Sequence, residues 1–296
     1  MSRPAGYAVS LVAPPGYAHS EALREVALTV HHGLVRMGRD SMLCGPADAP
    51  ERRHIVLGSH LLDEGDDALP PGAVLYNLEQ VAPDSPWFDP ASVARLRRHR
   101  LWDYSARNIE ALERMGIVGA TLVPVGFCPE IAAPVPDIEE DIDVLFVGSV
   151  NPRRAAVLEA LSARGLRVEA RFGVYGAERD DLAARAKIVL NVHYYEARVF
   201  EIVRVSHMLA RHRFVVSETG ADLDEEGEFA PGVAFAEYED LVDTCLYYIA
   251  RPDLRRRVAA QGFAIMALRD ETRFLSPALA ALEGAAGTDA TPTQFR

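Results

Sequence analysis

Cysteine is scarce in this 296-residue sequence, and its spacing is not that of a metal centre. The three cysteines, Cys44, Cys128 and Cys245, are far apart in the chain. Neither a Cys-x-x-Cys pair nor a Cys/His cluster with zinc spacing is present, so we expect no metal site built on thiolates. Separated cysteines in odd number are typical of reduced thiols, which indicates a cytoplasmic protein.

Long apolar runs and excess positive charge are also missing. No segment approaches the roughly 20 apolar residues that a membrane-spanning helix needs, and residues 1–6 show no secretory signal, so we expect no transmembrane segment. The formal net charge of -12 argues against a nucleic acid as partner. The densest basic run, residues 95–100, is interpreted as a solvated helix face, with phosphate contact or peripheral membrane contact as the alternative.

Common catalytic motifs are absent as well. The sequence has no Gly-x-Gly-x-x-Gly, Walker, Gly-x-Ser-x-Gly or His-Glu-x-x-His motif. Two Asp-x-Asp sequences, residues 141–143 and 222–224, have a form that can hold a metal ion. The first precedes a strand and the second lies in an acidic loop, so we expect no metal ion at either.

What the sequence does contain is a repeated alternation of buried strands and helices. Residues 7–13 form an apolar strand run that two prolines stop, and residues 21–37 carry apolar side chains at steps of three and four. Short apolar strands follow, with a further helix from Ser105 to Gly116; these strands are predicted at residues 54–57, 73–78, 101–104 and 120–125. Such alternation favours a parallel sheet covered on both faces.

A break separates this half from a second one of the same kind. Residues 129–143 contain three prolines and an acidic run, which predicts a linker. Strands are then predicted at residues 144–147, 166–172, 188–192, 214–217 and 233–236, and helices after Pro152 and at residues 179–186, 199–210, 238–250 and 253–268.

The sequence therefore predicts an α/β protein with two Rossmann-like domains that face each other across a cleft. The predicted first domain is residues 1–138, the second is residues 139–283, and residues 284–296 form a flexible tail. Because ligands of open parallel sheets bind at the carboxyl ends of the strands, we expect the site between the two domains.

One candidate ligand contact is the turn after the strand at residues 144–147. Gly148 lets the backbone approach a ligand, Ser149 follows it, and a helix starts at Pro152. The start of a helix attracts phosphate groups, and Arg153, with its neighbour Arg154, can add charge-assisted hydrogen bonds. The alternative is an ordinary strand-to-helix turn.

A second candidate is the polar, aromatic loop after the strand at residues 188–192. Glu201 lies where the next helix opens, and one carboxylate can accept hydrogen bonds from both hydroxyls of a ribose. The other side chains of this cluster are Asn191, His193, Tyr194 and Arg198. Within the helix, Arg204 and His207 are three residues apart and share a face, on which they can meet a diphosphate. Local capping, and a structural role for His207, are the alternatives.

The first half offers fewer candidates. His19 follows the first strand and can take a proton from an acceptor hydroxyl; the alternative is a loop residue before the helix. Residues 57–60 and 76–80 are the polar ends of two further strands. We interpret both segments as candidates for binding an acceptor.

The second half resembles the nucleotide-binding domain of GT-B glycosyltransferases, in particular the CgeB-like and glycosyltransferase family 1-like group. The segments that carry the resemblance are residues 144–149, 186–192, 198–201, 214–218 and 238–262. It implies a nucleotide-sugar donor as substrate, with no bound cofactor, with Gly148 and Ser149 near the phosphates and Glu201 on the ribose. Counted back from Val215, however, the family's helix glutamate falls on His207, so both positions stay open.

Together these observations predict a metal-independent glycosyltransferase that moves a sugar to an unknown acceptor, which is a glycan, a peptide or a small molecule. Arg198 and Arg204 would stabilise the departing diphosphate, and His19 would act as the base if the reaction inverts configuration. Two alternatives remain: a catalytically inert nucleotide-binding scaffold with the same fold, and a sugar-nucleotide epimerase.

Overall fold

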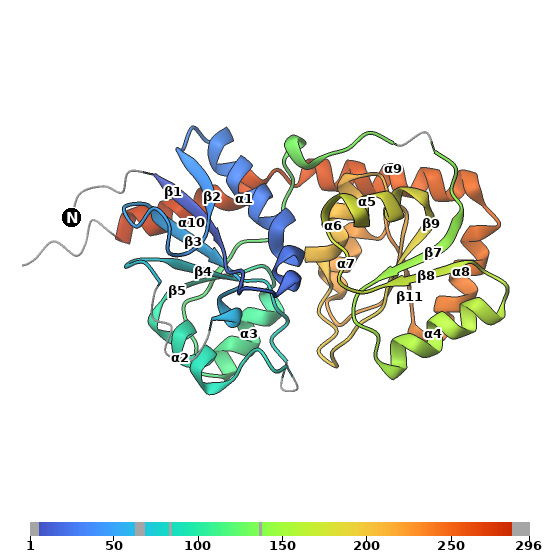
Figure 1. Ribbon diagram of the computed structural model, residues 1–296, viewed down its shortest axis with the longest axis horizontal. Coiled ribbons are helices and arrows are strands. Elements are labelled where there is room, and N and C mark those ends of the chain that lie inside the picture. Colours follow the sequence, from blue (N-terminus) through green and yellow to red (C-terminus); the bar gives the residue numbers. More distant parts are fainter. Residues whose placement is uncertain (1–5, 63–68, 83–84, 136–137, 286–296) are drawn as a thin grey trace, which may run out of the picture.

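Two separate parallel sheets with helices packed on them make up the molecule (Figure 1). The computed structural model describes residues 6–62, 69–82, 85–135 and 138–285. The first sheet has the order β2-β1-β3-β4-β5-β6. Its strands are β1 (Tyr7–Leu11), β2 (Ser41–Cys44), β3 (Arg53–Leu57), β4 (Val74–Asn77), β5 (Arg100–Asp103) and β6 (Thr121–Leu122).

The second sheet repeats the topology of the first. Its order is β11-β10-β9-β7-β8, and its strands are β7 (Ile142–Val147), β8 (Val168–Arg171), β9 (Ala186–Asn191), β10 (Val215–Glu218) and β11 (Ala234–Ala236). In each sheet the first strand has the second on one side and the third on the other. The strand order therefore reverses at β1/β3 and at β7/β9, and ligands of such sheets bind beside these reversals.

Helices cover both faces of the sheets, and this explains why the strands are continuous apolar runs. All five residues of β1 are buried, and Val144, Leu145 and Phe146 of β7 are fully buried. The helices are α1 (Arg24–Arg36), α2 (Pro90–Arg98), α3 (Ala106–Arg114), α4 (Pro152–Ala163), α5 (Gly176–Arg185), α6 (Ile202–Ala210), α7 (Leu223–Phe229), α8 (Leu241–Ile249), α9 (Pro252–Leu268) and α10 (Glu271–Ala285).

Local sequence sets several of these helix starts. Asp89, Ser105 and Asn151 each accept a hydrogen bond from the backbone N–H three residues later, and so cap α2, α3 and α4. The helix predicted from residue 199 begins instead at Ile202, because Arg198 has a φ of 45° and the chain turns there. The helix predicted over residues 21–37 is divided into a 3-10 turn (Ala18–Leu23) and α1.

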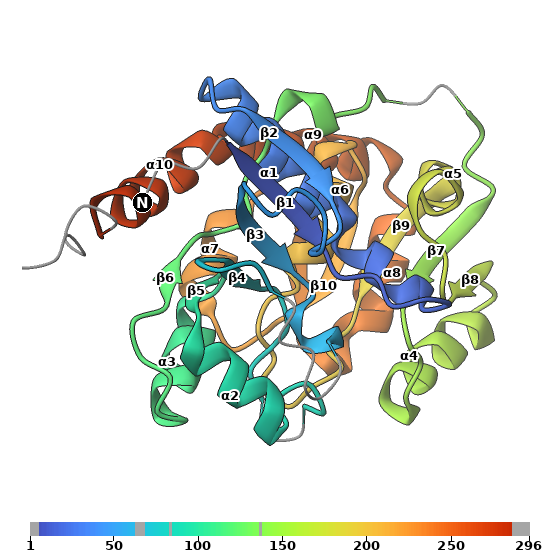
Figure 2. The ribbon, with the colours of Figure 1, turned by 60° about the vertical axis from the view of Figure 1, so that its left-hand side comes forward.

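The last helix differs most from the sequence prediction, which placed residues 139–283 in the second domain. α10 instead packs on α1: Leu275 is fully buried, and a Cβ added at Gly33 of α1 would lie 2.8 Å from its Cδ1. The Tyr7 hydroxyl also donates a hydrogen bond to Glu283 (2.8 Å). Figure 2 shows α10 beside the sheet of β1 and β2. Of the predicted tail, residues 284–285 end α10, and the rest lies outside the described residues.

We call β1–β6 with α1–α3 and α10 the first lobe, and β7–β11 with α4–α9 the second lobe. The chain crosses between them twice, before β7 and before α10. The two crossings are joined side by side, because Phe127 N–H donates to the Arg269 carbonyl (2.8 Å) and Glu271 N–H donates to the Phe127 carbonyl (3.0 Å). The first lobe is thus completed by α10, a segment that follows the second lobe in the chain.

The basic run at residues 95–100 is not simply a solvated face. Arg95 is buried, and its guanidinium donates to the carbonyls of Ser59 (2.9 Å) and Leu62 (3.2 Å). It thereby fixes the turn after β3. None of the helices in the described part of the chain is long and apolar enough to cross a membrane.

If α10 is a structural part of the first lobe, Leu275→Ala should lower the free energy of unfolding by about 2 to 5 kcal/mol, since it leaves a cavity under α1. Urea denaturation followed by circular dichroism measures this loss. Leu268→Ala, on α9, is the matched control because Leu268 is 75% exposed. Equal stability of the two variants would contradict the assignment of α10.

Candidate functional site

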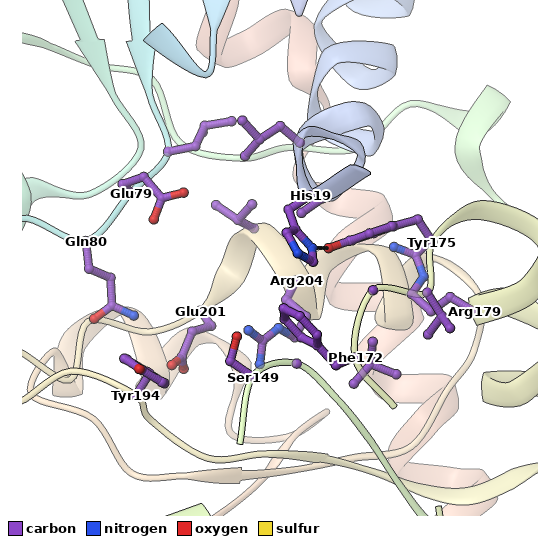
Figure 3. Close-up of a pocket in the computed structure, with 18 of the residues that line it drawn as sticks. His19, Glu79, Gln80, Ser149, Phe172, Tyr175, Arg179, Tyr194, Glu201 and Arg204 are labelled. Carbon is purple, nitrogen blue, oxygen red and sulfur yellow. Dashed lines mark hydrogen bonds between the residues drawn. The ribbon is translucent and has the colours of Figure 1, made fainter. Parts of the chain in front are cut away.

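A cavity of about 630 Å³ lies between the lobes, at the carboxyl ends of both sheets. The segments that follow β1, β3, β4, β7, β8 and β9 all contribute to its walls. Figure 3 shows Glu79 and His19 on the first-lobe side, and Ser149, Glu201 and Arg204 on the opposite side. The polar lining residues are Tyr17, His19, His60, Glu79, Gln80, Tyr104, Ser149, Arg154, Tyr175, Arg179, Tyr194, Tyr195, Glu201 and Arg204, with Trp87 and Phe172 among the apolar ones.

Two arginines place positive charge beside the turn that follows β7. A Cβ on Gly148, whose φ is 153°, would lie 3.6 Å from both terminal nitrogens of the Arg204 guanidinium. Arg154 is buried and donates to the carbonyls of Ser149 (2.8 Å) and Val192 (2.6 Å). Burial, together with the charge of Arg204, lowers the pKa of Arg154 to about 10, so that Arg154 is still cationic at neutral pH. This wall of the cavity suits an anion.

Glu201 carries an unused acceptor at the same wall. Its Oε2 accepts from Asn191 Nδ2 (2.7 Å) and lies 3.0 Å from His193 Nδ1. Its Oε1 is buried without a hydrogen-bond partner among the described residues, and the nearest cation is Arg154 Nη2 at 4.0 Å. Burial alone would raise the pKa of Glu201, but the interactions with His193, Arg204 and Asn191 together outweigh burial and lower the pKa to about 2. A buried, ionised oxygen without a donor is costly, so it indicates a place for a ligand hydroxyl.

Six of the predicted site residues line this cavity, and five do not. The lining residues are His19, Gly148, Ser149, Tyr194, Glu201 and Arg204. Asn191 and His193 lie behind Glu201 and hold its carboxylate, and Asn191 Oδ1 also accepts a hydrogen bond from Arg204 Nη1 (3.3 Å). The six lining residues could be located from the sequence as strand ends, because the first residues beyond a parallel strand are fixed by the strand itself.

The remaining three predicted residues are engaged elsewhere. Arg153 donates to the buried Glu218 at the end of β10 (2.6 Å) and lies over the Tyr238 ring. His207 contacts Asp180 of α5 (2.9 Å) and does not line the cavity, which excludes the predicted pairing of His207 with Arg204 on a diphosphate there. Arg198 is exposed in the turn before α6 and also lies outside the cavity lining.

The aromatic side chains after β8 were missed by the sequence analysis. His19 Nδ1 and the Tyr175 hydroxyl are joined by a hydrogen bond (2.6 Å) across the cleft, and the ring centroids of His19 and Phe172 are 4.5 Å apart. Arg179 crosses the cleft as well, with an ion pair to Glu25 (2.7 Å). The available signal was positional: Phe172 and Tyr175 follow a strand, as the predicted residues do.

On the first lobe, the two strand-end segments predicted to bind an acceptor reach the cavity. His60 Nε2 lies 3.5 Å from Glu79 Oε1, and the ring centroids of His60 and Trp87 are 4.8 Å apart. Burial lowers the pKa of His60 to about 4. Burial also raises the pKa of Glu79 to about 7, although the charge of Arg204 acts to lower it. Gln80 links the two lobes, because its Oε1 accepts a hydrogen bond from the Val199 N–H (3.2 Å).

The two Asp-x-Asp sequences lie away from this cavity. Asp141 pairs with Arg185 (2.6 Å) and Asp143 with Lys187 (2.6 Å). Asp222 caps α7 by accepting from Glu225 N–H. Within the described ranges, no group of three or more His, Cys, Asp or Glu side chains is arranged to hold a metal ion.

Comparison with solved structures identifies the class of fold. AviGT4, a glycosyltransferase involved in avilamycin A biosynthesis, is 18% identical and aligns over 94% of this chain and 98% of its own, with a TM-score of 0.59. HepE of Anabaena, solved in complex with UDP and glucose, is 12% identical over 94% and 98%, with a TM-score of 0.63. WaaG, a glycosyltransferase involved in lipopolysaccharide biosynthesis, is 12% identical over 94% and 100%, with a TM-score of 0.61. The chain has the GT-B glycosyltransferase fold.

Sequence comparison is less informative. No protein-family model matches the chain. The uncharacterized protein L140 of Acanthamoeba polyphaga mimivirus is 30% identical over 117 residues, which are 38% of this chain and 38% of L140. The uncharacterized protein L138 of the same virus is 32% identical over 110 residues, or 35% of this chain and 12% of L138. The chain thus spans well under half the length of these relatives.

The low pKa of Glu201 leads to a prediction about stability. A carboxylate with a pKa of about 2 in the folded protein, against about 4.3 when unfolded, stabilises the fold above pH 4.3, and this contribution is lost as the pH falls towards 2. We expect Glu201→Gln to flatten the rise in unfolding free energy between pH 2 and 5, measured by urea denaturation, by an amount on the order of 3 kcal/mol at most.

Glu110→Gln serves as the control, because Glu110 is exposed on α3. It should keep the wild-type pH profile. Identical profiles for wild type and Glu201→Gln would show that Glu201 is not held ionised by its surroundings.

Proposed function

We propose that this protein is a metal-independent glycosyltransferase that moves a sugar from a nucleotide sugar to an acceptor bound by the first lobe. One observation carries the proposal: Glu201, whose buried Oε1 has no hydrogen-bond partner among the described residues, lines the same wall of the cavity as the cations of Arg154 and Arg204. A nucleoside diphosphate sugar has the matching groups, since its ribose hydroxyls are donors and its diphosphate is an anion.

Each element of the donor has a counterpart in the second lobe. The diphosphate would lie at the Gly148 turn, where the absence of a side chain admits it next to the Arg204 guanidinium. The ribose would lie at Glu201, so that its hydroxyls satisfy the free carboxylate oxygen. The cavity volume is within the range of 300 to 1,000 Å³ typical of ligand sites. HepE of Anabaena, which shares the fold, has been solved with UDP-glucose, and this supports the choice of donor class.

The transfer then requires charge stabilisation at the leaving group. The acceptor oxygen forms a bond to the anomeric carbon while the bond from that carbon to the diphosphate oxygen breaks. Arg154 and Arg204 supply positive charge to the site, and this charge stabilises the negative charge that the diphosphate gains. For transfer with inversion, His19 is our candidate to accept the proton of the acceptor hydroxyl, since it lines the cavity from the first lobe.

We further propose membership of the CgeB-like group. The proposal rests on the residues after β7, in β9 and in β10 that carry the resemblance, and on the position of Glu201. Glu201 lines the cavity and has a carboxylate oxygen without a hydrogen-bond partner among the described residues, whereas His207 does not line the cavity. This favours Glu201 as the ribose contact.

A thermal-shift panel of UDP-, GDP- and dTDP-sugars tests the donor site. A ligand at 100 times its dissociation constant should stabilise the protein by about 2.7 kcal/mol. For the best ligand, we expect Arg204→Ala to weaken binding at least tenfold in isothermal titration calorimetry, because it removes one of two cations beside the Gly148 turn. Glu201→Ala should weaken binding to a similar extent.

Arg257→Ala is the control for the loss of a cation, since Arg257 is exposed on α9. Its affinity should equal that of the wild type. A panel without any shift would contradict the proposal. Binding without release of the nucleoside diphosphate would favour an inert scaffold, and a changed sugar without an acceptor would favour an epimerase.

A further inference from the structure

Glu79 stands out among the first-lobe residues that line the cavity, because it is the one acidic side chain that the described part of this lobe contributes to the lining. Its carboxyl group is directed into the cavity from the side opposite Glu201 and Arg204 (Figure 3). Its side chain is 24% exposed. Because Glu79 lies opposite the residues proposed to bind the donor, it is available to bind a second ligand.

The backbone of Glu79 is held unusually firmly. Asn77 brackets it, donating from Nδ2 to the Glu79 carbonyl (2.9 Å) and accepting from the Glu79 N–H (3.2 Å). Asn108 donates to the same carbonyl (2.9 Å), and both amides also donate to the buried Asp103, at 2.6 and 3.1 Å. This network fixes where the Glu79 side chain starts, as expected for a group that must meet a ligand in one orientation.

The surroundings of Glu79 favour a neutral, hydroxyl-rich ligand. No Lys or Arg occurs among the first-lobe residues described as lining the cavity, and the neighbouring His60 is neutral at pH 7 because burial lowers its pKa to about 4. Because the pKa of Glu79 is about 7, about half of its carboxyl groups are ionised at neutral pH, and an anionic group placed here would face that charge without a counter-charge from this lobe. A hydroxyl group, in contrast, can donate to that carboxylate.

Aromatic side chains complete this wall. Trp87 packs against His60 with the two ring planes tilted by 57°, and Tyr17 packs against His19 with ring centroids 5.1 Å apart. Both Trp87 and Tyr17 line the cavity, on the same lobe as Glu79. The faces of aromatic rings are negative, so they attract the C–H groups on the face of a sugar ring. A carboxylate flanked by aromatic rings suits a saccharide.

We propose that Glu79 binds and orients a hydroxyl group of an uncharged saccharide acceptor, and that it selects against acceptors that are anionic at the same place. This inference rests on the proposed function, because it assumes that the second lobe holds the donor. Asn77, Asn108 and Asp103 act as positioning residues for Glu79.

The test is a binding experiment on the full chain loaded with the nucleoside diphosphate of the best donor. Saturation-transfer NMR titrations would compare methyl glycosides of glucose, galactose, mannose and N-acetylglucosamine with their 6-phosphates. We expect at least one neutral glycoside to bind at least tenfold more tightly than its 6-phosphate. Glu79→Gln should weaken the binding of that glycoside at least fivefold, and Glu79→Lys should shift the binding preference towards the 6-phosphate.

Affinity for the nucleoside diphosphate and the melting temperature should stay within error in both Glu79 variants, and Glu110→Gln should behave as the wild type throughout. Preference of the wild type for the phosphorylated sugars, failure of every neutral glycoside to bind, or unchanged binding in Glu79→Gln would each overturn the inference. A wild-type protein that binds no nucleotide would instead contradict the proposed function, and the inference with it.

Discussion

The arrangement of parallel strands in the two sheets determines where everything else can act. In each sheet the order reverses next to the first strand, so the connections leave the carboxyl edge in opposite directions and open a crevice there. Because the two lobes face each other at these edges, two crevices combine into one cavity. Residues from both lobes, between positions 17 and 208 of the sequence, meet there without a contiguous motif.

The two walls of this cavity differ in the charged groups that they contribute. The second lobe contributes Arg154 and Arg204 together with the ionised Glu201, which are groups for an anion and a ribose. The first lobe contributes Glu79, the neutral His60 and aromatic rings. Positive charge is thus concentrated on the second-lobe side, so an anionic ligand is attracted to that side of the cavity more than to the other.

The sequence predicted the parts of the site that depend on short-range order. Gly148, Ser149 and Glu201 follow buried strands or open a helix, and such positions can be located from apolar runs and breaks alone. His207 and Arg153 could not be assigned in this way, because their partners Asp180 and Glu218 are 27 and 65 residues distant in the chain. The pattern of neighbouring residues does not indicate such a pairing. For the same reason, the apolar face of α10 could be predicted from the sequence, but the lobe on which it packs could not.

The way the lobes are joined limits how the cavity can open. The two chain crossings form a short parallel bridge at Phe127 and Asp270, and Gly126 N–H donates to the buried Glu271 carboxyl group (2.8 Å) beside it. On the cavity side, hydrogen bonds or ion pairs already link His19 to Tyr175, Gln80 to Val199 and Glu25 to Arg179. Any movement of one lobe relative to the other would have to break these three contacts. The bridge at Phe127 and Asp270 and the contacts around His19 thus join the lobes at separate places, and together they hold the two walls of the cavity face to face.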